Sequence, residues 1–362
     1  MGYFKNINLY NFRNFESLSL DFSNNCNVFF GQNGVGKTNI LEAISLFSKG
    51  RGFRKDRLTN ILKKNCKKFT LKSFFINQNI SYELLVESYE SNNKLYKKSL
   101  INGDKSKEAH ESLYTLSPFL YFLPETERLF ISSPSNRRNF IDRLIFSYNY
   151  SYLNCLNEYN KNLIERTKLL SSPNYDNNWL EIIEKKISSL GIQIYLFREK
   201  QIMKLLEYLN YFSGEYKLPY EINFKIKDDF YLKNINENIF IEQLKINRKI
   251  DSIIGGSKIG PHKSDYIFYI QDNYLVSQLS TGQQKTLILL MYLSQCKYLI
   301  DLFSKKPILL LDEICSHLDE VNRNILLTLV ESFDLQIFMT GTSKNLFSFL
   351  STKSNFCNIT NQ

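Results

Sequence analysis

The sequence of 362 residues lacks any run of the about 18 apolar residues that are needed to span a bilayer. Residues 1–20 mix charged and polar side chains throughout, which is not the pattern of a secretory signal. The six cysteines form no close CxxC pair, and the three histidines show no metal-ligand spacing. We therefore expect reduced, mostly buried thiols, no structural zinc site, no membrane partner and a cytoplasmic location.

The chain is short of acidic residues relative to basic ones, with 36 Asp and Glu against 46 Lys and Arg and a net charge of +10. This balance favours contact with a polyanion such as nucleic acid or a lipid surface. The alternative is a solvated surface of biased composition, because the chain is rich in Lys, Asn, Ile, Tyr and Phe. Charge alone leaves both interpretations open. The sequence has no additional acidic cluster with metal-site spacing, so a nuclease has no support.

The two ends of the chain read as sheet-forming segments. Apolar residues alternate over 7–22 and again over 69–101, which predicts strands. The run 308–311 is continuously apolar, as is typical of a strand buried on both faces of a parallel sheet, and Leu335 to Met339 reads as another such strand. The middle differs, because apolar residues at helical spacing over 153–170 and 180–197 flank a break at Pro173 and predict an antiparallel helical hairpin.

The segment after the apolar run Val28–Phe30 matches the P-loop pattern GxxxxGK[ST] in full, with a helical pattern following it. Its glycines let backbone N–H groups turn toward phosphate oxygens, and the helix N-terminus adds favourable partial charge. Lys37 is expected to reach the β- and γ-phosphates, and Thr38 to ligate Mg²⁺. The sequence thus predicts ATP and Mg²⁺ as cofactors, with nucleotide contacts from Gly31, Gln32, Asn33, Gly34, Val35, Gly36, Lys37 and Thr38.

A pair of acids, Asp312 and Glu313, directly follows the buried strand 308–311. A carboxylate at the end of such a strand can hold Mg²⁺, which suits Asp312. Glu313 is expected to polarise the attacking water as a general base. An acidic strand terminus is common in α/β proteins, but here a P-loop precedes it. We therefore predict Lys37, Asp312 and Glu313 as the catalytic residues.

The segment Leu279–Lys285 opens another helical pattern, and Ser280 is a suitable N-cap. The segment also resembles the signature of ABC-type ATPases, which contacts the γ-phosphate bound by the opposite subunit. Ser316-His317-Leu318-Asp319 resembles their D-loop, and the four motifs stand in the superfamily's order. The signature lies more than 240 residues after the P-loop, which points to the SMC-like branch with its inserted helical element.

The whole chain resembles the RecF family of bacterial recombinational repair proteins. The matching segments are Leu9–Phe15, the P-loop continued by Asn39–Ile44, Gly52–Arg54, Pro124-Glu125, Pro134–Asp142, Gly260–Lys263, the signature, Asp312-Glu313 and Thr340–Thr342. The chain departs from the family pattern at Ser132, Lys263 and Ser264. Lys263 stands where the family commonly has Arg, so it keeps the charge without the planar fork.

The resemblance implies an α/β fold, a P-loop ABC/SMC-type ATPase head whose lobe one carries a β-subdomain, with an inserted helical lobe two. We expect lobe one to comprise residues 1–125 and 251–362, and lobe two residues 126–250. It implies an ATP-dependent homodimer in which Ser280, Gly282 and Gln283 reach the nucleotide, and it adds Arg13 to the nucleotide contacts. It also implies a weak, DNA-stimulated ATPase that binds DNA at single-strand gaps or stalled forks and helps RecO and RecR to load recombinase.

Double-stranded and gapped DNA, bound with little sequence preference, is the implied partner. The candidate phosphate contacts form two basic clusters: Arg51, Arg54, Lys55 and Arg57, and then Lys63 and Lys64, which Lys67 and Lys68 follow. Solubilising surface lysines are the alternative. Two other functions stay open, namely a transporter ATPase subunit and a non-catalytic DNA-binding scaffold. The long insertion argues against the first, and the intact ATPase residues argue against the second.

Overall fold

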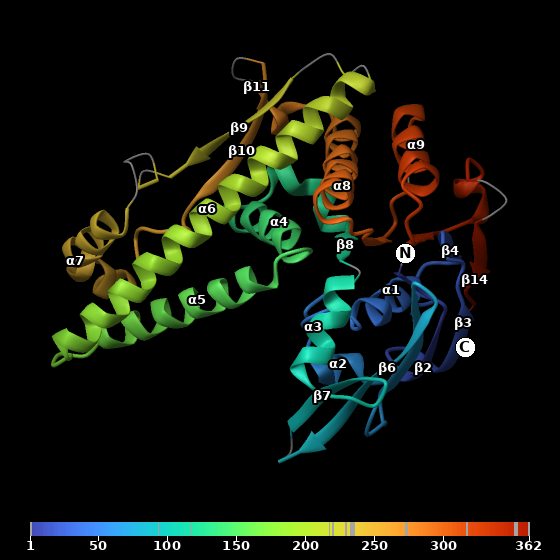
Figure 1. Ribbon diagram of the computed structural model, residues 1–362, viewed down its shortest axis with the longest axis horizontal. Coiled ribbons are helices and arrows are strands. Elements are labelled where there is room, and N and C mark those ends of the chain that lie inside the picture. Colours follow the sequence, from blue (N-terminus) through green and yellow to red (C-terminus); the bar gives the residue numbers. More distant parts are fainter. Residues whose placement is uncertain are drawn as a thin grey trace. The chain divides into compact units, whose positions relative to one another are not determined.

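The computed structural model describes residues 2–92, 94–116, 118–216, 218, 221–228, 230–231, 236–271, 274–315, 318–350 and 354–360. They form two compact units, Met1–Glu127 with Lys285–Gln362, and Arg128–Gln284 (Figure 1). The chain leaves the first unit close to the expected boundary at residue 125. It returns later than expected, because residue 250 lies inside helix α7 (Glu237–Ile254) and the second unit continues to Gln284.

A parallel sheet in the first unit carries the sequence motifs. Its strands are β4 (Cys26–Phe30), β8 (Phe119–Phe122), β12 (Ile308–Leu311), β13 (Ile337–Gly341) and β14 (Asn355–Asn358), in the order β14-β4-β13-β12-β8. All neighbouring strands are parallel. β12 and β13 are buried along their whole length, as the sequence of 308–311 and 335–339 predicted. The segments that follow β4, β12 and β13 therefore leave the same edge of the sheet.

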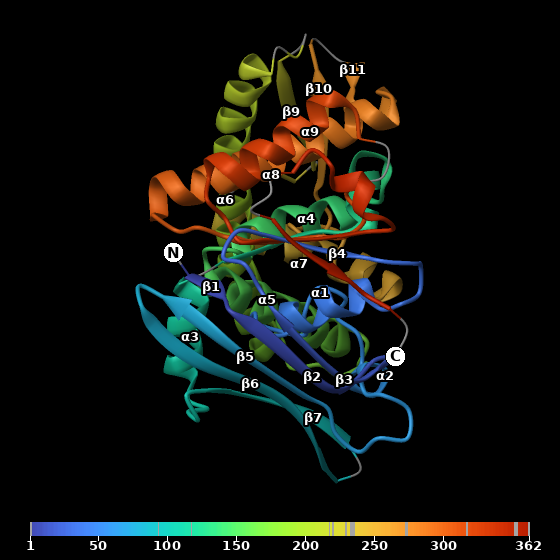
Figure 2. The same ribbon diagram turned by 90° about the vertical axis from the view of Figure 1, so that its right-hand side faces the viewer.

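An antiparallel sheet is the second sheet of this unit (Figure 2). It consists of β1 (Gly2–Phe4), β2 (Asn6–Phe12), β3 (Phe15–Asp21), β5 (Thr70–Asn77), β6 (Ile80–Ser91) and β7 (Lys94–Ile101). The order is β3-β2-β5-β6-β7, with β1 beside β5. Alternate residues such as Leu9, Leu71 and Val86 are buried in one core with helix α1 (Lys37–Ser45), while the intervening residues face solvent.

Short helices and one long helix complete the first unit. The short ones are α2 (Leu58–Ile61), α3 (Lys107–Leu116), α9 (Glu320–Leu327), a π-helical turn at Thr328–Ser332 and a 3-10 turn at Lys344–Phe347, and a further 3-10 segment, Pro124–Ile131, crosses from the first unit into the second. Helix α8 (Thr281–Phe303) begins at the end of the second unit and continues into the first. Its length and apolar composition would allow it to cross a membrane, but its apolar window is 72% buried within the structure, as in the core helix of a folded domain.

The second unit contains the predicted helical hairpin, which is confirmed as α5 (Tyr150–Leu170) and α6 (Asn177–Glu215) (Figure 1). The remaining elements are α4 (Pro134–Phe146), α7, a 3-10 turn at Val276–Gln278 and the antiparallel strands β9 (Ile222–Lys227), β10 (Asp265–Ile270) and β11 (Tyr274–Leu275). Arg166 joins three helices, because its guanidinium donates to Glu184 at 3.0 Å and to Asp251 at 2.6 Å.

Candidate nucleotide-binding site

The P-loop connects the end of β4 to the start of α1. Gly34 and Gly36 have φ values of 86° and 104°, which residues with a Cβ rarely adopt. A Cβ at Gly36 would also lie 2.6 Å from the ring of Phe15 and 2.7 Å from the Asn14 amide. Asn14 in turn donates its Nδ2 to the carbonyl of Val35 at 3.0 Å. The turn between β2 and β3 therefore braces the loop from outside.

Lys37 is buried inside this loop. Its ammonium donates to the carbonyls of Gly31 and Gln32, each at 2.8 Å. Desolvation lowers the pKa of Lys37, while the nearby carboxylates of Glu313 and Asp312 oppose that shift. The ammonium is thus held where the phosphates of a P-loop nucleotide bind.

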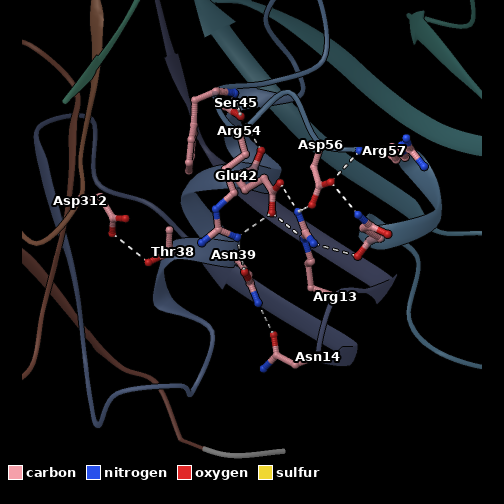
Figure 3. A network of polar contacts seen from close by, with 12 residues as sticks. Arg13, Asn14, Thr38, Asn39, Glu42, Ser45, Arg54, Asp56, Arg57 and Asp312 are labelled. Atoms are coloured by element: carbon pink, nitrogen blue, oxygen red, sulfur yellow. Dashed lines mark hydrogen bonds and ion pairs between the residues drawn. The ribbon is translucent and has the colours of Figure 1, made fainter. Parts of the chain in front are cut away.

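Asp312 and Glu313, the Walker B acids, directly follow β12, and Asp312 contacts the helix that begins at the P-loop. Thr38 donates its hydroxyl to Asp312 Oδ1 at 3.0 Å, although 274 positions separate them (Figure 3). Thr340, from β13, donates to the same oxygen at 2.7 Å. Burial raises the pKa of Asp312, and the two hydroxyl donors counteract that shift. The parallel order β4-β13-β12 is what brings these three side chains together.

The oxygens of Thr38 and Asp312 fit Mg²⁺, which prefers hard oxygen ligands in proteins. Within the described ranges, no three His, Cys, Asp or Glu side chains gather into a group that could hold a metal by themselves. That agrees with the usual Mg²⁺ arrangement at nucleotides, in which one or two protein groups share the ion with phosphates and water. The expected metal site is therefore chemically suitable but depends on the nucleotide.

Glu313 leaves the strand through a left-handed backbone conformation, with φ at 52°. Its backbone N–H donates to Thr340 Oγ1 at 2.9 Å, and its side chain is exposed. Thr340 thus orients both acids of the pair. Thr340 belongs to a segment that carries the family resemblance, but its role in the site depends on β13 lying between β4 and β12, which the sequence does not indicate.

Arg13, in the turn after β2, belongs to a network of charged groups centred on Glu42 of helix α1 (Figure 3). Its guanidinium donates to both oxygens of Glu42, at 2.7 and 2.5 Å, and to Asp56 at 2.9 Å. Arg54 donates to Glu42 at 3.2 Å and to Asn39 at 2.9 Å. Two carboxylates therefore hold Arg13, and its direct contact with nucleotide stays a prediction. The buried carboxylate of Glu42, absent from the predicted site, is the centre of this network.

Most residues of the two predicted basic clusters are exposed, and two of them, Arg54 and Lys63, pair with carboxylates. Arg51, Lys55 and Arg57 are exposed. Arg54 is also exposed, but it forms an ion pair with Glu42 at 3.2 Å. In the second cluster, Lys63 pairs with Glu16 at 3.5 Å, while Lys64, Lys67 and Lys68 are exposed. Lys97 on β7 holds the segment just before the first cluster, because its ammonium donates to the carbonyls of Leu46 and Gly50 at 3.0 and 2.7 Å.

The signature segment lies at the end of the second unit. The Ser280 hydroxyl accepts from the backbone N–H of Gln283 at 3.3 Å, and Gln283 Oε1 accepts from the Ser280 N–H at 3.1 Å. This reciprocal cap fixes the start of α8. Ser280, Gly282 and Gln283 are all exposed, and a Cβ added at Gly282 would meet nothing within 4 Å.

The remaining motifs are partly visible. Ser316 and His317 of the expected D-loop lie outside the described residues, whereas Asp319 caps α9 by accepting from the N–H of Asn322 at 2.8 Å. Of the departures from the family pattern, Lys263 is exposed, and buried Ser264 donates to Asp228.

The fold and the P-loop–Walker B geometry define an ATPase head of the SMC class. A family description for the RecF/RecN/SMC N-terminal domain matches residues 3–361. The Smc head bound to the C-winged helix domain of ScpA shares the fold, with a TM-score of 0.55 at 15% identity over 96% of this chain and 91% of that one.

Relatives from Rickettsia narrow the assignment. The DNA replication and repair protein RecF of Rickettsia typhi is 33% identical over 343 residues, 93% of either chain, and that of Rickettsia conorii is 31% identical over 351 residues, 96% of either chain. The recombination mediator RecF–ATPrS of the RecFOR pathway gives a TM-score of 0.83 at 28% identity, covering 97% of this chain and 94% of that one. The chain belongs to the RecF family of DNA replication and repair proteins, which confirms the resemblance and the predicted fold class.

Proposed function

We propose that this protein is an ATP-dependent DNA-binding protein of recombinational repair. In this proposal it binds gapped DNA or stalled forks as an ATP-closed dimer in the cytoplasm, and helps RecO- and RecR-type partners to load recombinase. The observation that carries the ATPase part is the 3.0 Å contact between Thr38 Oγ1 and Asp312 Oδ1, beside the buried ammonium of Lys37. Solved RecF structures with ATP or ATPrS, similar to this chain, support the choice of nucleotide.

The chemistry is hydrolysis of the terminal phosphate of ATP. Lys37 and the loop N–H groups bind the phosphates, and Thr38 and Asp312 provide oxygens for Mg²⁺. Mg²⁺, when bound, supplies positive charge that offsets the charge developing on the phosphate oxygens. Glu313 accepts the proton of the attacking water. Thr340 positions Glu313 at the end of β12, because its hydroxyl oxygen accepts the backbone N–H of Glu313 at 2.9 Å.

The proposed dimer is supported by the exposure of the signature segment, in which Ser280 and Gly282 are accessible to a second copy of the chain. Ser280 and Gly282 stand on a capped helix start, where N–H groups favour anions. In the proposed dimer they close over the γ-phosphate held by the P-loop of the other copy. ATP binding then closes the dimer on DNA, and hydrolysis opens it. The proposed phosphate contacts are Arg51, Arg54, Lys55, Arg57, Lys63 and Lys64, of which Arg54 also pairs with Glu42 and Lys63 with Glu16.

The first experiment is steady-state ATP hydrolysis with and without gapped DNA, beside a Lys37→Ala control. We expect slow turnover that rises with DNA and vanishes in the control. Turnover that does not change with DNA, with no DNA retained in the presence of ATP at low salt, would contradict the repair function. The chain would then be an ATPase head alone, and the transporter subunit would be the better alternative. Binding of DNA without any turnover would favour the scaffold.

The dimer has its own test. The Ser280→Arg variant should bind ATP as a monomer but fail to dimerise, because the long cation occupies the space that the second copy's phosphate needs. Sedimentation with ATP measures this, and normal ATP-dependent dimers of the variant would refute the arrangement.

A further inference from the structure

The solvent face of the antiparallel sheet carries exposed aromatic side chains that neither the core nor the nucleotide site uses. Tyr10 on β2, Tyr89 on β6 and Tyr96 on β7 are 44%, 46% and 42% exposed. Tyr89 and Tyr96 are direct cross-strand partners, and their rings stack at 5.6 Å with an interplanar angle of 25°. These large apolar faces are therefore presented to solvent on one side of the sheet (Figure 2 shows these strands).

The register places the three tyrosines at one end of the sheet. Tyr10 and Glu87 both pair with Thr70, the first residue of β5, and Tyr89 lies two residues beyond Glu87 on the same face. Tyr10 thus lies two strand spacings, about 10 Å, from strand β6, and Tyr89 lies two residues, about 7 Å, further along that strand. A hairpin-stabilising stack would account for Tyr89 and Tyr96. It does not account for Tyr10, which lies two strands away.

A lysine-rich loop, residues 63–68, closes the same end of the sheet. Lys63 donates its N–H to the carbonyl of Asn11 at 3.0 Å, and Asn11 Nδ2 donates to the carbonyl of Lys68 at 3.3 Å. On the other side, Ser88 donates its N–H to the carbonyl of Phe69 at 3.1 Å. The loop is therefore tied to the immediate neighbours of Tyr10 and Tyr89.

The charge balance at this end is positive. The lysines are Lys63, Lys64, Lys67, Lys68, Lys94 and Lys98, and the carboxylates are Glu16, Glu87 and Glu90. Glu16 and Glu87 already pair with Lys63 and Lys98, each at 3.5 Å. Lys64, Lys67 and Lys68 are exposed on the loop that is tied to the neighbours of Tyr10 and Tyr89. Aromatic faces beside unneutralised lysines suit a polyanion whose bases are accessible.

We propose that Tyr10, Tyr89 and Tyr96, with the lysine-rich loop 63–68, form a stacking surface for single-stranded DNA. Unpaired bases stack on the tyrosine rings, and the lysines contact the phosphates. Duplex DNA keeps its bases stacked internally, so it gains from the lysines but not from the rings. This surface deepens the proposed function and rests on it, since it names the part of the protein that distinguishes a gap from a duplex.

The test uses the full chain with Tyr89→Leu and Tyr96→Leu combined, and Tyr89→Phe with Tyr96→Phe as the matched control. Leucine keeps an apolar side chain on the strand and removes the ring, whereas phenylalanine keeps the ring and removes the hydroxyl. Fluorescence anisotropy measures binding of an oligothymidylate of about 16 nucleotides and of a duplex of equal length. We expect the leucine variant to lose about tenfold in affinity for the single strand and less than about twofold for the duplex, with the phenylalanine variant near wild type.

Three results would overturn the stacking surface: unchanged single-strand binding by the leucine variant, equal losses on both probes, or equal losses in the leucine and phenylalanine variants. If the wild-type protein binds neither probe with ATP, the proposed function fails as well. A second measurement does not depend on variants. Photo-crosslinking of an iodouracil oligonucleotide to wild-type protein should label the peptides that contain Tyr10, Tyr89 or Tyr96, and labelling confined to other peptides would contradict the surface.

Discussion

Replacing Glu42 with Gln tests whether the buried carboxylate on the P-loop helix holds the surrounding loops in place. Glu42 is 1% exposed and accepts both bonds of the Arg13 fork, at 2.7 and 2.5 Å, with Arg54 at 3.2 Å. Gln keeps the size of the side chain but removes the charge and turns an amide donor toward a guanidinium. Each side chain in the pair is thereby left with a poor partner in a mostly buried site.

The loss in free energy of unfolding that Glu42→Gln should cause can be estimated from this geometry. Breaking a buried ion pair by changing one member costs about 3–5 kcal/mol, and a charged hydrogen bond contributes about 1.5–3 kcal/mol. Arg13 keeps Asp56 at 2.9 Å, and Arg54 is one-third exposed, so solvent screens its share. We therefore expect the Glu42→Gln variant to lose about 2–3 kcal/mol, or about 4–12 °C in Tm for a unit of this size.

Urea unfolding separates the two units. Far-UV circular dichroism follows both, while fluorescence of the single tryptophan, Trp179, follows the second unit alone. The circular dichroism transition of the Glu42→Gln variant should move to lower urea, with the Trp179 transition less affected. Glu16→Gln is the matched control, because Glu16 is exposed and its ion pair with Lys63 is long, at 3.5 Å. This control should change the free energy of unfolding by less than about 0.5 kcal/mol. If both variants unfold alike, Glu42 does not hold the loops.

Three further predictions concern the P-loop, the Walker B acids and the second unit. Gly36→Ala should abolish ATP binding in a filter assay, while Gly34→Ala, with a similar φ but no neighbour within 4 Å of its Cβ, should weaken it less; equal effects would remove the role of the clash. Thr340→Val should slow ATP hydrolysis about tenfold while leaving ATP binding near wild type, because the N–H of Glu313 loses its acceptor; unchanged turnover would contradict this. Burial lowers the pKa of His262 from 6.5 to about 4, so the folded state binds fewer protons than the unfolded chain in that window, and stability should fall as pH drops through it. A His262→Gln variant should show a shallower slope in urea unfolding across that pH range.

Several features follow from the sequence alone, because they depend on neighbours along the chain. The P-loop is a local pattern of glycines between a strand and a helix, and its backbone angles at Gly34 and Gly36 need no distant contact to be expected. The hairpin of α5 and α6 follows from apolar residues at helical spacing on either side of Pro173. The acidic pair could be assigned a chemical role from its position after a fully apolar strand.

The tertiary structure decided the features that join distant segments. The order β4-β13-β12 places Thr340 between Thr38 and Asp312, and no local pattern indicates which strand lies between two others. The buried charge of Glu42 is compensated by Arg13 and Arg54, which the fold places around it. The gathering of three tyrosines at one sheet end depends on strand register. The return to the first unit after Gln284, inside helix α8, depends on which unit each part of that helix packs with. Periodicity along the chain tells which face of a strand is buried, but neighbours across a sheet are chosen by the packing of the whole unit.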